Sequence, residues 1–186
     1  HMQFAQGRHA DTGDRRLGRK KAVILSMSAA STVVSLHIAP TGAATMQSVD
    51  QVRAVAGRGL EGDRYFSKLG TYSNDPGTGR HVTLIEIEAI EALKREYDLD
   101  VAPGLSRRNM VTRGVALNHL VGREFTVGEV VLRGMRLCEP CAHLEKLTRQ
   151  GVMRGLIHRG GLRAEIVSGG TIHIDDSIVP RGEHAA

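Results

Sequence analysis

The amino-acid sequence predicts a mainly β domain of the α+β class, β-barrel-like, with two or three helical insertions. Three observations lead to this prediction. The chain contains 22 glycines, which indicate many tight turns between short strands. Short runs rich in Val, Ile and Thr recur along it, and one segment shows clear helical spacing of apolar residues. At 186 residues the chain has the size of one domain with a single core.

The expected strands are short, and most are bounded by glycine, proline or aspartate. They cover residues 32–37, 49–55, 110–112, 124–127, 130–137, 163–167, 171–174 and 177–179. Residues 67–80 contain several turn formers, including Asn74, Asp75 and Pro76, and show no periodicity. We therefore expect a long loop there, and loops of this length are often functional.

The clearest helix follows this loop. Its apolar side chains recur at helical spacing, at Ile87, Ile90, Leu93 and Tyr97. Thr83 and Glu86 match a capping box, T-x-x-E, which would start the helix. A second, short helix is expected from Pro140 to Gly151, and a further helical turn over residues 153–157.

The net charge of +5 belongs mainly to the start of the chain. Residues 1–26 carry a net charge of +4, whereas the remainder carries only +1. Because the body has no overall positive charge and only 3% aromatic residues, nucleic-acid binding is not expected as the main function. We interpret residues 1–26 as a disordered leader with a cloning-derived start, and residues 27–186 as the domain.

The apolar segments and the number of cysteines indicate in which cellular compartment the protein is expected. Basic residues followed by Ala22-Val23-Ile24-Leu25 imitate the start of a secretory signal, but serines interrupt the apolar part. No stretch approaches the roughly 20 apolar residues that cross a bilayer. Two cysteines in a chain of this length do not form a disulfide framework. We therefore expect a cytoplasmic protein without a membrane partner.

The densest group of reactive residues is Cys138-Glu139-Pro140-Cys141-Ala142-His143, where a strand is expected to end and a helix to begin. A helix N-terminus favours the thiolate form, which binds soft metals and attacks sulfur or acyl groups. Cys141 is the better placed thiol, because strand alternation is expected to bury Cys138. Two packed, unreactive cysteines explain the spacing equally well. A zinc site of Cys138, Cys141, His143 and His158 is a third interpretation, although a second paired motif is missing.

Candidate anion-binding residues lie elsewhere in the chain. Arg107, Arg108 and Asn109 precede a strand and offer two guanidinium groups beside an amide, although such a run is often simply solvated surface. Arg163 follows a flexible Gly-Gly-Leu segment and is a third cation. His81 follows the long loop, where it would either donate to an anion or pack against the next helix.

Together these segments resemble the MOSC family, the C-terminal module of molybdenum-cofactor sulfurases, in its stand-alone bacterial form. The resemblance spans residues 32–180. It rests on the ordered set G-L-E-G-D-R-Y at 59–65, G-R-H-V-T-L-I-E at 79–86, S-R-R-N-M-V-T-R-G at 106–114, L-V-G-R-E-F-T-V-G at 120–128, E-P-C at 139–141 and R-G-G-L-R-A-E-I at 159–166.

The resemblance implies a β-barrel-like fold with one essential cysteine, which matches Cys141. In members that reduce N-hydroxylated compounds this cysteine ligates molybdenum, and the matching Arg107 and Asn109 help to hold the pterin. Arg108 stands where the eukaryotic members tend to have proline, so pterin contacts are expected to differ. Within these 186 residues we expect neither the N-terminal β-barrel domain of those enzymes nor the pyridoxal-phosphate half of the sulfurases.

Three hypotheses follow. The first is a molybdenum-cofactor protein that reduces N-hydroxylated substrates, with Cys141 as metal ligand; Arg107, Arg108, Asn109, Arg163 and His81 would grip the pterin cofactor, and an electron-donor protein would be the partner. The second is a sulfur carrier with a persulfide on Cys141, loaded by a sulfur-donor protein. The third is a zinc-stabilised module without catalytic activity.

Overall fold

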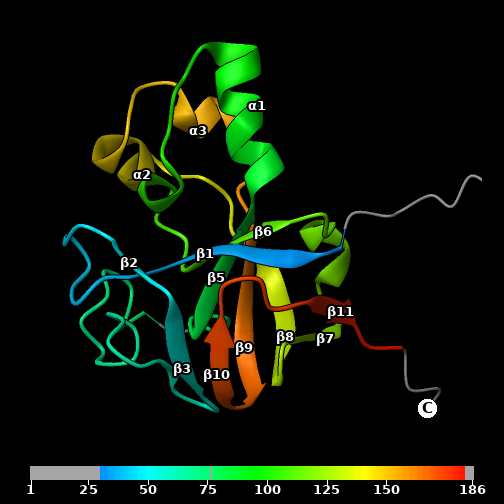
Figure 1. Ribbon diagram of the computed structural model, residues 1–186. Coiled ribbons are helices and arrows are strands. Elements are labelled where there is room, and N and C mark those ends of the chain that lie inside the picture. The colour runs from blue at the N-terminus through cyan, green and yellow to red at the C-terminus, as the bar shows by residue number, and fades with distance from the viewer. Residues whose placement is uncertain (1–29, 76, 183–186) are drawn as a thin grey trace, which may run out of the picture.

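The computed structural model describes residues 30–75 and 77–182, and these form two β-sheets and a group of helices (Figure 1). The leader expected over residues 1–26 lies outside this part of the chain. Among the described residues, no helix has the length and apolar character needed to cross a membrane.

Eight strands form the larger sheet, in the order β11-β7-β8-β9-β5-β6-β1-β2, and three form a smaller one, in the order β10-β3-β4. Among the described strands, β5 and β6 pair in parallel and the other neighbours are antiparallel. The strands are β1 (Thr32–Ile38), β2 (Gln47–Val49), β3 (Gln51–Val55), β4 (Gly59–Leu60), β5 (Val82–Glu86), β6 (Met110–Arg113), β7 (Glu124–Val127), β8 (Val130–Leu137), β9 (Leu162–Ser168), β10 (Gly170–His173) and β11 (Ile178–Pro180).

The large sheet curves until its two ends approach each other. An isolated bridge joins Thr32, at the start of β1, to Ser177, next to β11. The pairing there is not a continuous ladder, so the sheet is barrel-like in outline and not a closed barrel. The predicted α+β class is confirmed.

The main core lies between the inner faces of the two sheets. It is built almost entirely from aliphatic side chains, as the scarcity of aromatic residues requires, and Phe125 is its one aromatic member within the described residues. Residues of β1, β5, β8 and β9 interdigitate with it, including Val33, Leu84, Leu132 and Leu162, which have no exposed surface.

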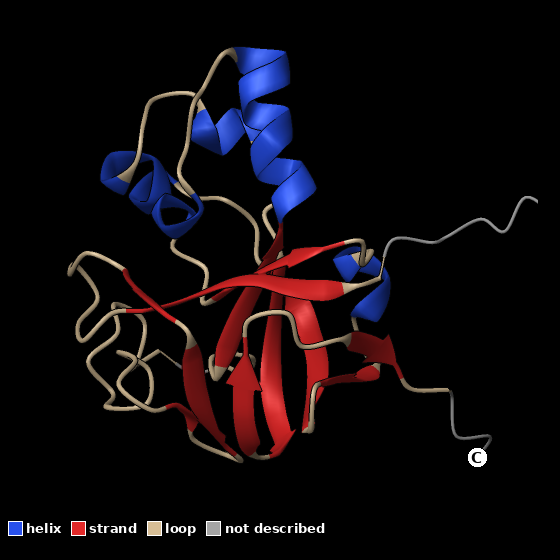
Figure 2. Ribbon diagram, viewed as in Figure 1, coloured by secondary structure: helices blue, strands red, loops and turns tan. Residues whose placement is uncertain are grey.

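The three α-helices gather at one end of the strands (Figure 2), and two short 3-10 helices complete the fold. The α-helices share a second apolar cluster, in which Leu93, Leu144 and Val152 are buried together. The helices are α1 (Ile87–Tyr97), η1 (Pro103–Ser106), η2 (Leu117–Leu120), α2 (Ala142–Leu147) and α3 (Val152–Gly155). The loop between β8 and α2, residues 138–141, carries both cysteines and is called the cysteine loop below. It lies at the junction between the helices and the large sheet.

The predicted strands are confirmed to within one residue at most positions, although residues 49–55 belong to two strands, β2 and β3. The predicted capping box is wrong. Thr83 lies in strand β5, and Glu86 precedes α1 without forming a side-chain cap. Strand β5 lies between β6 and β9, and both of its faces are covered: Leu84 packs in the main core and Ile85 in the helical cluster. Its first four residues are therefore all buried and lack the alternation that marks a strand in a sequence.

Candidate functional site

The two cysteines lie in the loop between β8 and α2 and differ in accessibility. Cys138 is buried with 2% of its surface exposed, whereas Cys141 is exposed, and both are free thiols. The Cys138 amide donates to the carbonyl of Gly161 at 2.7 Å, and the Cys141 carbonyl accepts from the Glu145 amide at 3.1 Å. The expected burial of Cys138 is therefore confirmed, and the backbone holds Cys141 at the start of α2.

Arg108 holds the backbone of this loop in place through hydrogen bonds. It is 7% exposed, and its guanidinium donates to three backbone carbonyls. Nε donates to Gly160 at 2.9 Å, Nη1 to Ser106 at 3.2 Å and Nη2 to Cys138 at 3.1 Å. Because these contacts connect η1, the cysteine loop and the segment before β9, Arg108 positions the backbone that carries Cys141.

A small pocket of about 60 Å³ surrounds the Cys141 side chain. Four arginines contribute to its lining against one carboxylate, so the pocket favours an anionic ligand. Arg64 is the arginine already paired, with Asp63 at 3.1 Å. The charged lining residues are Arg64, Arg107, Arg108, Arg163 and Glu139; the others include Tyr65, Thr71, Tyr72, Thr83, His143 and Leu144.

Tyr72, from the loop over residues 67–80, stands next to Cys141. Burial raises the pKa of Tyr72, and a negative charge on the Cys141 sulfur and a hydrogen bond between the two side chains raise it further, while Arg163 opposes the shift. The ring of His143 meets the Tyr72 ring edge-on, with 6.3 Å between centroids. No sequence motif indicated Tyr72 itself; the only signal was the prediction that its long loop would be functional.

Arg107 forms a wall of the same pocket. Its guanidinium donates to the carbonyls of Ala44 at 2.9 Å and Gly42 at 2.7 Å, which fixes the side chain across the loop between β1 and β2. Burial, followed by the nearby charge of Arg64, lowers the pKa of Arg107. On its far side Arg107 lines a second, larger pocket, so this one side chain separates the two cavities.

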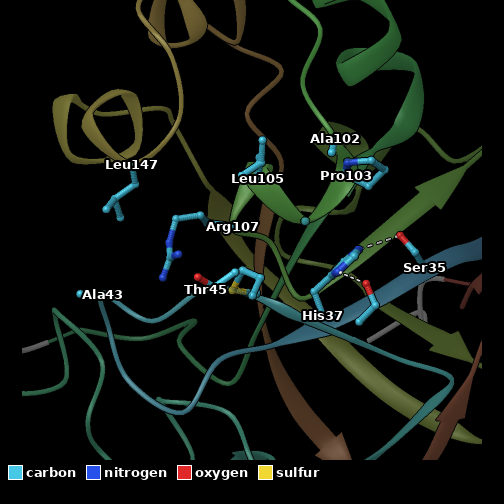
Figure 3. Close-up of a pocket in the computed structure, with 12 residues that line it drawn as sticks. Ser35, His37, Ala43, Thr45, Ala102, Pro103, Leu105, Arg107 and Leu147 are labelled. Carbon is cyan, nitrogen blue, oxygen red and sulfur yellow. Dashed lines mark hydrogen bonds between the residues drawn. The ribbon is translucent and has the colours of Figure 1, made fainter.

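The larger pocket has a volume of about 630 Å³ and mainly apolar walls, which come from the β1–β2 loop, η1 and α2 (Figure 3). Its polar corner is His37, whose Nε2 lies 2.9 Å from Ser35 Oγ and whose Nδ1 lies 3.2 Å from Ser48 Oγ. Burial lowers the pKa of His37, which favours the neutral ring. A cavity of this size and character suits a small organic molecule.

Two of the predicted site residues do not line either pocket. The Asn109 amide is 1% exposed and fully used inside the protein: Oδ1 accepts from the amide and the hydroxyl of Thr83, and Nδ2 donates to the His37 carbonyl and to Asp63 Oδ1. His81 accepts from the Ile166 amide through Nδ1 at 3.1 Å, and burial lowers its pKa. The structure thus brings Arg107, Arg108 and Arg163 to Cys141, and uses Asn109 and His81 to join strands.

The residues of the proposed zinc site are not gathered. Within residues 30–75 and 77–182, no group of three or more His, Cys, Asp or Glu side chains is placed to hold a metal ion. Cys138 faces the interior, while His158 is exposed and lies 3.6 Å from Glu139. This arrangement gives the zinc hypothesis no geometric support.

Comparison with known proteins places the chain in a family. A model of the MOSC domain matches residues 71–179, more than half of the chain, and no curated protein sequence matches significantly. YuaD from Bacillus subtilis superposes with a TM-score of 0.67 at 18% identity, over 80% of this chain and 94% of that one.

Two YiiM proteins share the fold as well. YiiM from Geobacillus stearothermophilus has a TM-score of 0.62 at 12% identity, over 84% of this chain and 77% of that one. YiiM from Escherichia coli has a TM-score of 0.59 at 20% identity, over 83% and 72%. At these identities the structures show a common fold and nothing more. The family model and the fold agree, and the chain belongs to the MOSC domain family.

Proposed function

We propose that this protein binds a molybdenum–pterin cofactor in the pocket around Cys141, with the Cys141 thiolate as metal ligand, and that the loaded protein reduces N-hydroxylated compounds. One observation carries the binding part of this proposal: an exposed thiol opens into a pocket whose lining includes four arginines and one carboxylate. The class of reaction comes from the resemblance to MOSC proteins that act on such compounds.

The residues present fit such a cofactor in chemistry and, with the neighbouring cavity, in size. Thiolate is a suitable ligand for a soft metal, and arginine forks match phosphate oxygens. A pocket of about 60 Å³ is too small for a pterin body, whereas the cavity of about 630 Å³ behind Arg107 falls in the range of small-molecule sites. Cys141 would therefore hold the metal, and Arg107, which lines both cavities, would have to move for the pterin to occupy the larger one.

The cofactor supplies the two-electron chemistry, in which two electrons and two protons convert an N–OH group into N–H and water. Arg163 and Arg107 would attract its negative charge, and Arg108 would keep the Cys141 backbone in place. Tyr72 is hydrogen-bonded to Cys141 and would stabilise charge on its sulfur. The electrons must come from a donor protein that carries a flavin, a haem or another redox centre.

The alternative function is that of a sulfur carrier, and the small volume of the Cys141 pocket favours it. A pocket of about 60 Å³ accommodates one additional sulfur atom without rearrangement. In this case the Cys141 thiolate attacks the outer sulfur of a donor persulfide. The sulfur–sulfur bond of the donor breaks and the donor leaves as a thiolate, so no external oxidant or reductant is needed.

Metal and pterin analysis tests the proposal. Wild-type protein, Cys141→Ser and the control Cys138→Ala are expressed in a host that makes the molybdenum cofactor. We expect near-stoichiometric molybdenum and pterin in wild type and in Cys138→Ala, and loss of both in Cys141→Ser. The control separates loss of the exposed ligand from a general effect of removing a thiol.

Absence of molybdenum and pterin from the wild type would overturn the cofactor proposal. Sulfur released by cyanide as thiocyanate then tests the alternative on the same three proteins. A persulfide on Cys141 gives thiocyanate from wild type and Cys138→Ala but not from Cys141→Ser. If none of the three releases sulfur after incubation with a persulfide donor, the carrier function is wrong as well.

A further inference from the structure

We propose that Arg80, Arg136 and Arg163 form an oxyanion subsite beside the Cys141 pocket, which binds a terminal phosphate group of the ligand. The inference identifies where a phosphate of the ligand binds. It rests on the proposed function only for the identity of the group that binds at Cys141. Its basis is a pair of like-charged residues, Arg136 and Arg163, at opposite positions of two strands.

Arg136 and Arg163 face each other directly across the antiparallel strands β8 and β9. Like charges at directly opposite positions destabilise a sheet. Farther along the same two strands Arg133 faces Glu165, which is the favourable arrangement. The Arg136–Arg163 pair therefore costs stability unless an anion lies between the two guanidinium groups.

A third arginine and a cavity complete the subsite. A pocket of about 300 Å³ is lined by Tyr72, Asp75, Arg80, Arg136 and Arg163, so three guanidinium groups face one carboxylate. Arg80 donates to the carbonyls of Tyr72 and Asp75, which ties it to the loop over residues 67–80. Among the residues that the structure describes, neither the Arg136 nor the Arg163 guanidinium group forms a hydrogen bond or an ion pair. Their planar donor groups match the oxygens of phosphate.

The subsite is continuous with the pocket around Cys141. Tyr72 and Arg163 line both cavities. The side chain of Tyr72 is hydrogen-bonded to Cys141, so it lies at the end of the subsite nearest the thiol. The charge of Arg163 acts on the same tyrosine and lowers its pKa. A ligand with its phosphate between Arg136 and Arg163 therefore extends naturally towards the Cys141 sulfur.

Inorganic phosphate is the probe, used with protein from a host that makes no molybdenum cofactor. Thermal unfolding is followed in increasing phosphate at constant ionic strength, with chloride as the reference salt. Wild type, Arg136→Gln and the matched control Arg133→Gln are compared. Phosphate should raise the melting temperature of wild type and control above that in chloride, with a shift that grows with the logarithm of phosphate concentration above the dissociation constant. The affinity of Arg136→Gln derived from the same shifts should be lower by about tenfold or more.

The same experiment carries a second readout that a purely structural arginine would not give. Without phosphate, Arg136→Gln should melt at or above the wild-type temperature because the like-charge contact is relieved. Arg133→Gln should melt slightly lower, because Arg133 loses its ion pair with Glu124 at 2.6 Å. A wild-type protein that phosphate stabilises no more than chloride does, or an Arg136→Gln variant with wild-type affinity, would overturn the inference.

Cys141→Ser separates this inference from the proposed function. The variant should bind inorganic phosphate as wild type does, because the subsite contains no atom of Cys141. Phosphate binding in a protein that acquires no molybdenum would leave the subsite standing and remove only the cofactor. Loss of phosphate binding in Cys141→Ser would contradict a subsite built on the three arginines.

Discussion

Arg108 donates from Nη2 to the carbonyl of Cys138 at 3.1 Å, so a buried cation holds the backbone three residues before the exposed thiol. The same guanidinium holds Gly160 and Ser106, and three separate segments therefore share one side chain. Arg108 also lines the Cys141 pocket, but all three of its guanidinium nitrogens already donate to backbone carbonyls. Its main role in this fold is to position the cysteine loop.

Replacing Arg108 with Met should destabilise the protein by about 2–4 kcal/mol, because three buried carbonyls lose their donor. The measurement is the free energy of unfolding in urea. Alkylation of Cys138 under native conditions should also become faster as the loop loosens. Arg133→Met, on an exposed and ion-paired arginine, should change stability by less than about 1 kcal/mol. Equal effects of the two substitutions would contradict the positioning role.

Asn109 connects three strands and the turn at Asp63, because its amide serves both β5 and the end of β1 from the start of β6. Asn109→Ala should cost about 2–4 kcal/mol of unfolding free energy, since it leaves several buried groups unpaired. Asn118→Ala is the matched control, because Asn118 is exposed and its side chain donates to the His158 carbonyl. A loss no larger than that of the control would show that the amide network contributes little.

The accessible cysteine was predictable from sequence because one local rule decided it. Extending the alternation of Val130, Leu132 and Gly134 along β8 predicts that Cys138 turns inward. Cys138 is indeed buried, although a β-bulge after Gly134 interrupts the alternation. Strand β5 was not predictable by that rule, because both of its faces are buried: Val82 and Leu84 pack in the main core and Ile85 in the helical cluster. Its Thr83 and Glu86 then imitated a helix start, and only the pairing with β6 and β9 distinguishes the two structures.

The anion subsite could not be predicted from the sequence, for a different reason. Tyr72 and Arg80 come from the loop over residues 67–80, Arg136 and Arg163 come from two strands, and no spacing in the chain relates them. Of these, only Arg163 was a candidate. The register of β8 against β9 decides that Arg136 faces Arg163, and a β-bulge between Gly134 and Arg136 sets that register. Such a juxtaposition becomes visible only in the folded structure.

Gly161 should not tolerate a side chain. Its φ of +110° is a conformation that favours glycine, and a Cβ atom there would collide with the carbonyl oxygen of Leu84 in β5. Gly161→Ala should therefore cost at least about 3 kcal/mol or prevent folding. Circular dichroism and urea unfolding provide the measurement. Gly182→Ala, where nothing lies within 4 Å of the new Cβ, should be neutral.

The coupling between Tyr72 and Cys141 is open to direct titration. Burial and the Cys141 side chain raise the pKa of Tyr72, so removing the sulfur should lower the titration midpoint of this tyrosine towards its ordinary value. Ultraviolet absorbance of the tyrosinate is compared in wild type, Cys141→Ala and Cys138→Ala, with Tyr72→Phe to assign the signal. An unchanged midpoint in Cys141→Ala, or an equal shift in both cysteine variants, would show that the two side chains are not coupled.

His37 should make the protein less stable in mild acid. Burial lowers its pKa below the ordinary value of 6.5, so near that pH the unfolded chain binds a proton that the folded protein resists. Stability contributed by the neutral ring is thus present above pH 6.5 and is lost as the pH falls below it. His81, with a pKa lowered by the same cause, acts in the same direction.

The urea midpoint measured from about pH 7.5 to about pH 5 tests this dependence. His37→Gln should flatten part of the acid slope. The hydroxyls of Ser35 and Ser48 can rotate to accept from a protonated ring, so acid need not break these contacts. The slope therefore reports the cost of charging a buried ring, and a slope unchanged in His37→Gln would assign that cost to other residues.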